Sequence, residues 1–227
     1  MLACIAMGAL CLSVVLSLVG ISSEDSYRHL AQHAAAGQYV SLQSAQSADH
    51  RVHMIALLNL GLLVVTGAAF IAWFRSAYTN VERLGVTGMR WSPGWAVGAW
   101  FVPFLALVRP KAILNDIWRG SDPRLPSGGS LGQEKPPVLY AFWWGLWLLS
   151  SVIAGGTGES FQNARTLSAL SSATGAMIFS DVLSVIAAIL AIAVIYSIDS
   201  RQRRRAEAVD PFAGLPSHVQ NLMRSTR

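Results

Sequence analysis

The sequence predicts an all-α integral membrane protein with four transmembrane helices and a proline-containing segment that is re-entrant or interfacial on the cytoplasmic side. Three observations support this fold class. The chain of 227 residues is 53% hydrophobic and only 13% charged. Its apolar residues are gathered into long blocks separated by short polar stretches, which is typical of membrane proteins. One further apolar run is interrupted by proline and has positive charge on both sides.

Four blocks are long enough, or nearly so, to cross a bilayer, since a spanning helix needs about 20 mostly apolar residues. They cover about residues 2–21, 54–74, 138–154 and 177–198. We interpret the first block as a retained span. It lacks a basic n-region, it exceeds the usual h-region of about 7 to 15 residues, and no convincing cleavage site follows it.

The segment 91–118 is apolar but poorly suited to span. Its apolar run, from Trp95 to Val108, is too short for a spanning helix. Pro103 interrupts this run and Pro110 ends it, and proline breaks helical hydrogen bonding. We expect this part to be re-entrant or interfacial, with Pro103, Pro110, Trp95, Trp100 and Phe104 in structural roles and the three aromatic residues packed against the helices. Residues 111–118 then predict a short amphipathic helix on the inner leaflet, with Asp116 off its apolar face.

Lys and Arg are enriched on the cytoplasmic side of membrane proteins. If 91–110 does not cross, most of the basic residues fall on one side, with Arg75 at the inner interface and both termini in the cytoplasm. A five-span alternative, in which 91–110 crosses, gives nearly the same charge split and stays open. The predicted membrane domain covers 1–198, and 199–227 forms a basic cytoplasmic tail without a long helix. We expect four tail arginines to meet anionic lipid headgroups: Arg201, Arg203, Arg204 and Arg205.

The connections follow from composition. Residues 22–51 are polar and predict an outer loop, with a helical stretch near 27–36. The second helix is expected to continue past the membrane to Gly85, a residue type that often ends helices. Residues 120–137 are rich in Gly, Pro and Ser and predict a loop.

Several short motifs occur in a specific order: WFRSAYTN from Trp73, SPGW from Ser92, WFVPFLALVRP from Trp100, DIW from Asp116 and FWWGLWLLS from Phe142. Together they resemble a bacterial integral-membrane family known as domain of unknown function 4328, over roughly residues 52–198. Relatives often carry soluble modules before the first span, which implies an inner N-terminus. Relatives also tend to have Asn between the two prolines, where this chain has Ala106 or Leu107. The resemblance implies no established activity.

Two groups of polar residues are candidate sites. His29, His33, His50 and His53 occur at helical spacings that could form an extracytoplasmic zinc or copper site, but an ordinary polar loop is the preferred interpretation. Asp181 is a carboxylate inside an apolar block, and such residues are functional candidates in membrane proteins. Arg51 and His53, at the outer end of the second helix, are its expected partners. A structural cap or interfacial pair is the preferred interpretation, and a transport or proton-relay site is the alternative.

Catalysis finds no support in the sequence, because no phosphate-binding loop, metal-binding motif or nucleophile set is present. We therefore expect a protein that is not an enzyme and has no cofactor. The leading hypothesis is an accessory or scaffold subunit that packs against the lipid bilayer and other membrane proteins or itself. A small-solute or ion transporter that uses Asp181 and the broken 91–110 segment is the first alternative, and metal binding by the histidines is the second. Nothing in the sequence indicates nucleic-acid binding.

Overall fold

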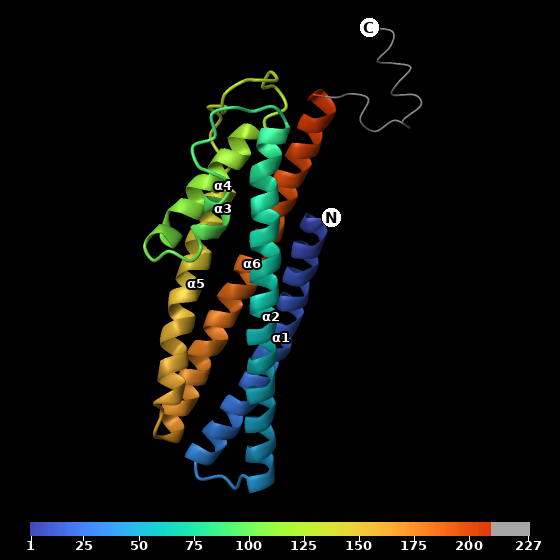
Figure 1. The fold of residues 1–227 in the computed structure, drawn as a ribbon. Coiled ribbons are helices and arrows are strands. Elements are labelled where there is room, and N and C mark those ends of the chain that lie inside the picture. The colour runs from blue at the N-terminus through green and yellow to red at the C-terminus, as the bar shows by residue number, and fades with distance from the viewer. Residues whose placement is uncertain (210–227) are drawn as a thin grey trace, which may run out of the picture. The chain divides into compact units, whose positions relative to one another are not determined.

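The computed structural model describes residues 1–209 and is helical throughout (Figure 1). There are four long helices: α1 (Leu2–Ala35), α2 (Leu42–Arg83), α5 (Val138–Gln162) and α6 (Leu167–Val209). Short connections join α1 to α2 and α5 to α6. Between α2 and α5 lie α3 (Trp95–Gly98), the 3₁₀ helix η1 (Leu105–Leu107) and α4 (Arg109–Gly120). The chain divides into two compact units. Unit 1 holds residues 1–3, 70–141 and the described residues after 192, and unit 2 holds 4–69 and 142–192.

The four long helices are long and apolar enough to cross a membrane, which confirms the predicted all-α fold with four membrane-spanning helices. The re-entrant or interfacial position of 91–118 stays a prediction. Within the described residues, 91–110 is not among these candidate spans, because it contains only the short α3 and η1. The long helices extend well beyond their apolar blocks. Most of the expected outer loop 22–51 is helical, since α1 continues to Ala35 and α2 begins at Leu42. The Ala, Gln and Arg residues there are good helix formers.

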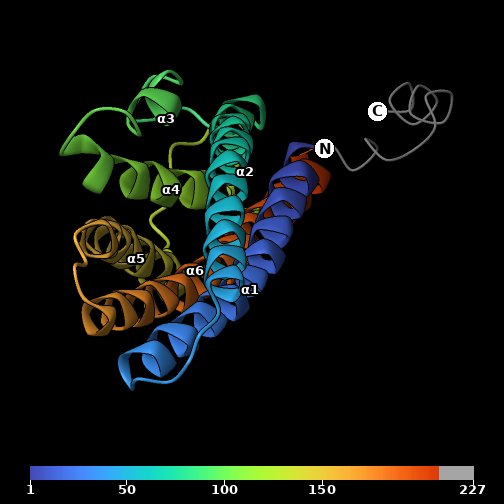
Figure 2. The same ribbon diagram turned by 90° about the horizontal axis from the view of Figure 1, so that it is seen from below.

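Unit 2 is a bundle built from parts of α1, α2, α5 and α6. Figure 2 shows α1 beside α2, and the Ser13 and Thr66 hydroxyls, 3.0 Å apart, form a hydrogen bond between these two helices. Tyr27 of α1 approaches Phe161 of α5, with ring centroids 6.3 Å apart. Many large apolar side chains of this unit are exposed, as expected for helices whose outer faces contact lipid.

Unit 1 has a protein core beneath α4. Ile113, Leu114 and Ile117 form the apolar face of α4 and are fully buried. The C-terminal part of α2 contributes a buried face of its own, at positions 73, 74, 77, 78 and 81. The predicted helix at 111–118 is confirmed as part of α4. Its apolar face, however, is covered by protein and is not free to lie on a lipid surface. Gly85, where the second helix was predicted to stop, follows the end of α2 with φ +77°.

The chain after Asp199 differs from the sequence prediction. Helix α6 continues through the basic run to Val209. The buried face of α6 also continues, through Ile198, Gln202 and Arg205. This spacing of three to four residues keeps one side of the helix against unit 1, so residues 199–209 are folded because they pack. The rest of the predicted tail lies outside the described residues.

Candidate functional site

The two ends of segment 91–110 are tied together in unit 1. The guanidinium carbon of Arg109 lies 4.4 Å from the ring centroid of Trp91 and 4.2 Å from that of Trp95. Such cation–π contacts are worth about 0.5–2 kcal/mol each. The Tyr78 hydroxyl of α2 donates a hydrogen bond to the Trp91 carbonyl and accepts one from the Trp91 N–H at 3.2 Å. The segment is therefore a closed loop anchored on α2.

Trp100 provides a second anchor. Its ring meets those of Phe70 and Phe74 edge-on, with both pairs of centroids 5.7 Å apart. Such aromatic pairs add about 0.5–1.5 kcal/mol beyond area burial. Pro110 is buried in the first turn of α4, where proline is favoured because its missing N–H has no helical partner. Trp95, Trp100 and Pro110 thus hold the loop to the body of unit 1.

The end of this loop, residues 101–108, is here called the apolar tip. Phe101 is 72% exposed and Phe104 is 84% exposed. The expectation that Phe104 packs against the helices is therefore wrong, because the chain turns sharply at this residue. Phe104 has φ +62°, and the Leu105 N–H donates to the Pro103 carbonyl at 2.7 Å. This is a γ-turn with positive φ, a strained conformation for a residue with a Cβ atom.

Asp116 lies on α4 with no solvent exposure, contrary to the prediction that it faces away from the buried side. Arg90 explains this burial, since its Nε and Nη2 donate to the two carboxylate oxygens at 2.8 and 2.5 Å. These hydrogen bonds raise the pKa of Arg90 above its ordinary value. Arg119 lies 4.0 Å from the same carboxylate. The three side chains border an open depression of about 330 Å³, which Leu131, Gly132 and Gln133 complete.

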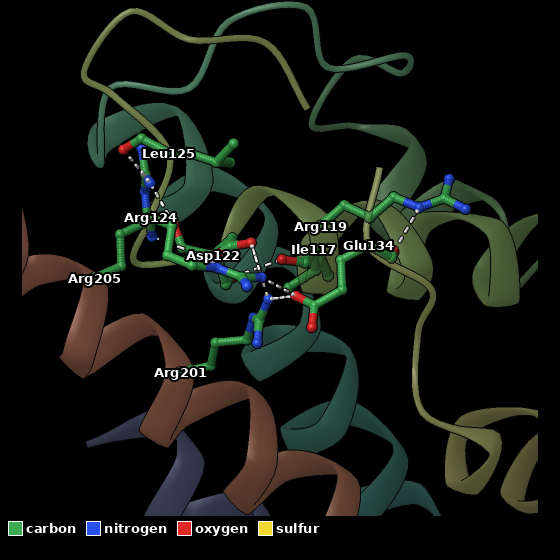
Figure 3. A network of polar contacts seen from close by, with 9 residues as sticks. Ile117, Arg119, Asp122, Arg124, Leu125, Glu134, Arg201 and Arg205 are labelled. Carbon is green, nitrogen blue, oxygen red and sulfur yellow. Dashed lines mark hydrogen bonds and ion pairs between the residues drawn. The ribbon is translucent and has the colours of Figure 1, made fainter. Parts of the chain in front are cut away.

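Figure 3 shows a second polar network, in which α6 holds the loop that follows α4. Arg205 of α6 has no solvent exposure. Its Nη1 donates to the carbonyls of Asp122 at 2.6 Å and Leu125 at 3.1 Å, and its Nη2 donates to the carbonyl of Leu84 at 3.0 Å. One charged side chain therefore joins the loop after α4 to the end of α2, through three backbone carbonyls of unit 1.

Arg201, one turn earlier on α6, makes the next layer of the network. It forms ion pairs with Asp122, at 3.5 Å, and with Glu134, and its guanidinium carbon lies 3.9 Å from the ring centroid of Trp118. Hydrogen bonds from Arg124, together with the charge of Arg201, lower the pKa of Asp122 from 3.8 to about 2. The acidic groups of this loop are thus fixed in place by arginines.

These contacts change the prediction for the basic tail. Arg205 is buried and Arg201 is largely covered, so only Arg203 and Arg204 of the four arginines are exposed. Arg203 is paired with Asp199. Arg205 is therefore not available to lipid headgroups, because its guanidinium is directed at backbone carbonyls. Lipid binding by the exposed arginines stays a prediction.

The predicted histidine site is not assembled in the structure. All four histidines are exposed, and His29 lies 3.5 Å from Asp25 on the same helix. Within residues 1–209, no three or more His, Cys, Asp or Glu side chains are grouped so that they can hold a metal ion. The geometry therefore gives no support to a zinc or copper centre at this place.

Asp181 lies on α6 in unit 2 and faces α1. A Cβ atom placed on Gly20 would lie 3.9 Å from the Asp181 Oδ2 and 3.5 Å from the Asn59 Nδ2. Arg51, its predicted partner, is exposed, and the described residues contain no ion pair between Arg51 and Asp181. Glu24 instead places a second carboxylate on the same face of α1, one helical turn beyond Gly20.

Sequence reasoning missed Glu24, Asp116 and Arg205. Glu24 stands just outside an apolar block and looked like part of a polar loop. Asp116 was assigned to the exposed side of its helix, although Arg90 was available to neutralise it. The signal for Arg205 was the helical spacing from Ile198 through Gln202, which was obscured because a run of arginines also marks the cytoplasmic end of a span. Arg75 is exposed on α2, eight residues before that helix ends at Arg83, and its position at the inner interface stays a prediction.

Comparison with protein-family profiles matches residues 36–200 to a domain of unknown function, DUF4328. No curated protein and no solved structure matches the chain. The matched region includes all of α2, α3, η1, α4 and α5, and most of α6. It contains the anchored loop 91–110, while Arg201 and Arg205 of α6 lie just beyond its end. Since the match covers well over half of the sequence, the chain belongs to the DUF4328 family.

Proposed function

We propose that this protein is a non-catalytic accessory or scaffold subunit of the bacterial inner membrane, which packs against another membrane protein through its apolar tip. The observation that carries the proposal is an anchored loop with an exposed end. Trp91, Trp95 and Arg109 close the loop, while Phe101 and Phe104 at its end contact little of the protein. A large apolar surface that is held in place and left uncovered is typical of an interaction site.

The charges around the loop support a structural role over catalysis. Asp116 is bound by Arg90, and Asp122 is bound by Arg124 and Arg201. Each of these carboxylates is engaged by a guanidinium within unit 1. Such pairs fix a surface in one geometry, which is what a docking platform requires.

The distribution of basic residues supports a cytoplasmic position for unit 1. Residues 70–141 contain eight Lys and Arg and residues 201–205 contain four, while unit 2 has only Arg28, Arg51 and Arg165. The positive-inside rule then favours cytoplasmic N- and C-terminal ends. Single cysteines in a background without Cys4 and Cys11 test this orientation. A probe that cannot cross membranes should label Ser44→Cys from outside and Gly88→Cys only after permeabilisation, and outside labelling of Gly88→Cys would reverse this part of the proposal.

The scaffold role is tested by photocrosslinking in native membranes. A benzophenone amino acid in place of Phe104 should give a discrete protein adduct that mass spectrometry identifies. The matched control is the same substitution at Leu60, an exposed apolar residue of α2 in unit 2, which should react only with lipid. If Phe104 also gives only lipid adducts, the tip is a membrane anchor and the scaffold proposal fails.

A further inference from the structure

A polar stripe runs along α1 in unit 2. Gly20, Glu24 and Arg28 are spaced four residues apart and so lie on one face of this helix. Gly20 faces Asp181 of α6, as described above. At the other end of the stripe, a Cβ atom placed on Gly175 of α6 would lie 3.4 Å from the guanidinium carbon of Arg28. Glu24 therefore lies between two points at which α1 contacts α6.

Glu24 is buried without a counter-charge. Glu24 is only 9% exposed. Its Oε2 atom is buried and has no hydrogen-bond partner. Within the described residues Glu24 forms no ion pair, and the Nε of Arg28 is likewise buried without a hydrogen-bond partner. The stripe thus contains an acid and a base on neighbouring turns that do not neutralise each other directly.

The other charged groups of the bundle lie outside this contact. From α6 the group facing α1 is Asp181, which is half-buried, and from α2 it is the neutral amide of Asn59. The remaining ionisable side chains near the same ends of α2 and α5 are exposed: Asp49, His50, Arg51, His53 and Glu159. The charged group that α6 presents to this face of α1 is therefore another carboxylate, one helical turn from Glu24.

Two ionised carboxylates in this position are unfavourable for two reasons. An unpaired charge inside a membrane bundle costs several kcal/mol, because the surroundings are poorly polarisable. A second negative charge, one turn away along the same contact between α1 and α6, adds to that cost. A single bound proton removes one charge and supplies an O–H donor for the unpartnered oxygen.

We propose that Glu24 and Asp181 form an exchangeable proton-binding site within the spanning bundle and hold one proton between them. Glu24, the more buried group, is the principal carrier, and Asp181 accepts the proton when Glu24 releases it. The total charge of the pair stays at minus one during this exchange. This inference is independent of the scaffold role, because it concerns unit 2 alone.

A hydrophobic carbodiimide tests the proposal, because it reacts with protonated buried carboxyls and leaves a mass tag. In the full-length protein in liposomes, Glu24 should be labelled near neutral pH, and labelling should fall as the pH rises. Asp181→Asn removes the neighbouring negative charge. In this variant the labelling of Glu24 should therefore fall at a lower pH than in the wild type. Glu159→Gln, which removes an exposed carboxyl on α5, is the matched control and should leave the labelling of Glu24 unchanged.

The wild-type measurement decides the question even if a variant fails to fold. Absence of label on Glu24 at every pH would overturn the proposal. Protection of Glu24 by sodium ions at constant pH would also overturn it, because the pair would then bind a metal cation in place of a proton. An Asp181→Asn profile identical to the wild type would show that the two carboxyls do not act together, and the shared site would be rejected.

Discussion

Replacing Arg205 with alanine is expected to release the loop that follows α4. The substitution removes three hydrogen bonds from a buried guanidinium to the carbonyls of Leu84, Asp122 and Leu125. Hydrogen bonds to a charged group contribute about 1.5–3 kcal/mol each. Because the three bonds share one donor and the loop relaxes, the expected loss is about 3–5 kcal/mol in unit 1, less than the simple sum.

Hydrogen exchange measured by mass spectrometry in a mild detergent is the appropriate assay. A loss of about 3 kcal/mol in local stability corresponds to roughly 100-fold faster exchange. The acceleration is expected in peptides covering residues 84–90 and 121–130, whose backbone Arg205 holds. Peptides from unit 2 should change little. Arg204→Ala is the matched control, since Arg204 is the adjacent residue in the sequence and is exposed.

Arg205→Lys separates charge from geometry. Lysine keeps the positive charge, but its single ammonium group cannot reproduce the planar fork that reaches three carbonyls. We expect exchange rates between those of the wild type and Arg205→Ala. If Arg205→Ala exchanges as slowly as Arg204→Ala, the three hydrogen bonds do not stabilise the loop and this reasoning is refuted.

Three further perturbations test other contacts. The pKa of Asp122 is about 2 in the folded state, below its ordinary value of 3.8. The ionised carboxylate therefore contributes about 2 kcal/mol to the free energy of unfolding above pH ~4, and this contribution is lost as the pH falls toward 2. In denaturant titrations, the free energy of unfolding should fall less on acidification for Asp122→Asn than for the wild type. Gly120→Ala places a Cβ atom 2.3 Å from a methyl carbon of Val81 and should destabilise by about 1–3 kcal/mol. Adding Val81→Ala should recover part of this loss, while Gly145→Ala, where no atom lies within 4 Å, should change stability little. Phe104→Gly should raise the unfolding midpoint by relieving about 1 kcal/mol of backbone strain, whereas a lower midpoint would contradict strain at this turn.

Composition and hydrophobic periodicity were enough to predict the four long helices and the absence of a spanning helix at 91–110. Both depend on local properties, since crossing hydrocarbon requires a long apolar run and proline breaks such a run. The stop near Gly85 and the start of α4, with Pro110 in its first turn, also follow from local backbone preferences.

Only the tertiary structure decided which polar groups are buried and with what partners. The sequence by itself determined that Asp116, Arg205 and Glu24 are polar and lie near or beyond the ends of apolar blocks, which favours exposure. Asp116 is buried because Arg90, 26 residues earlier, binds both of its oxygens. Arg205 is buried because three carbonyls from distant turns converge on it. The free energy of burying a charge depends on partners that folding brings from elsewhere in the chain, so no local pattern specifies it.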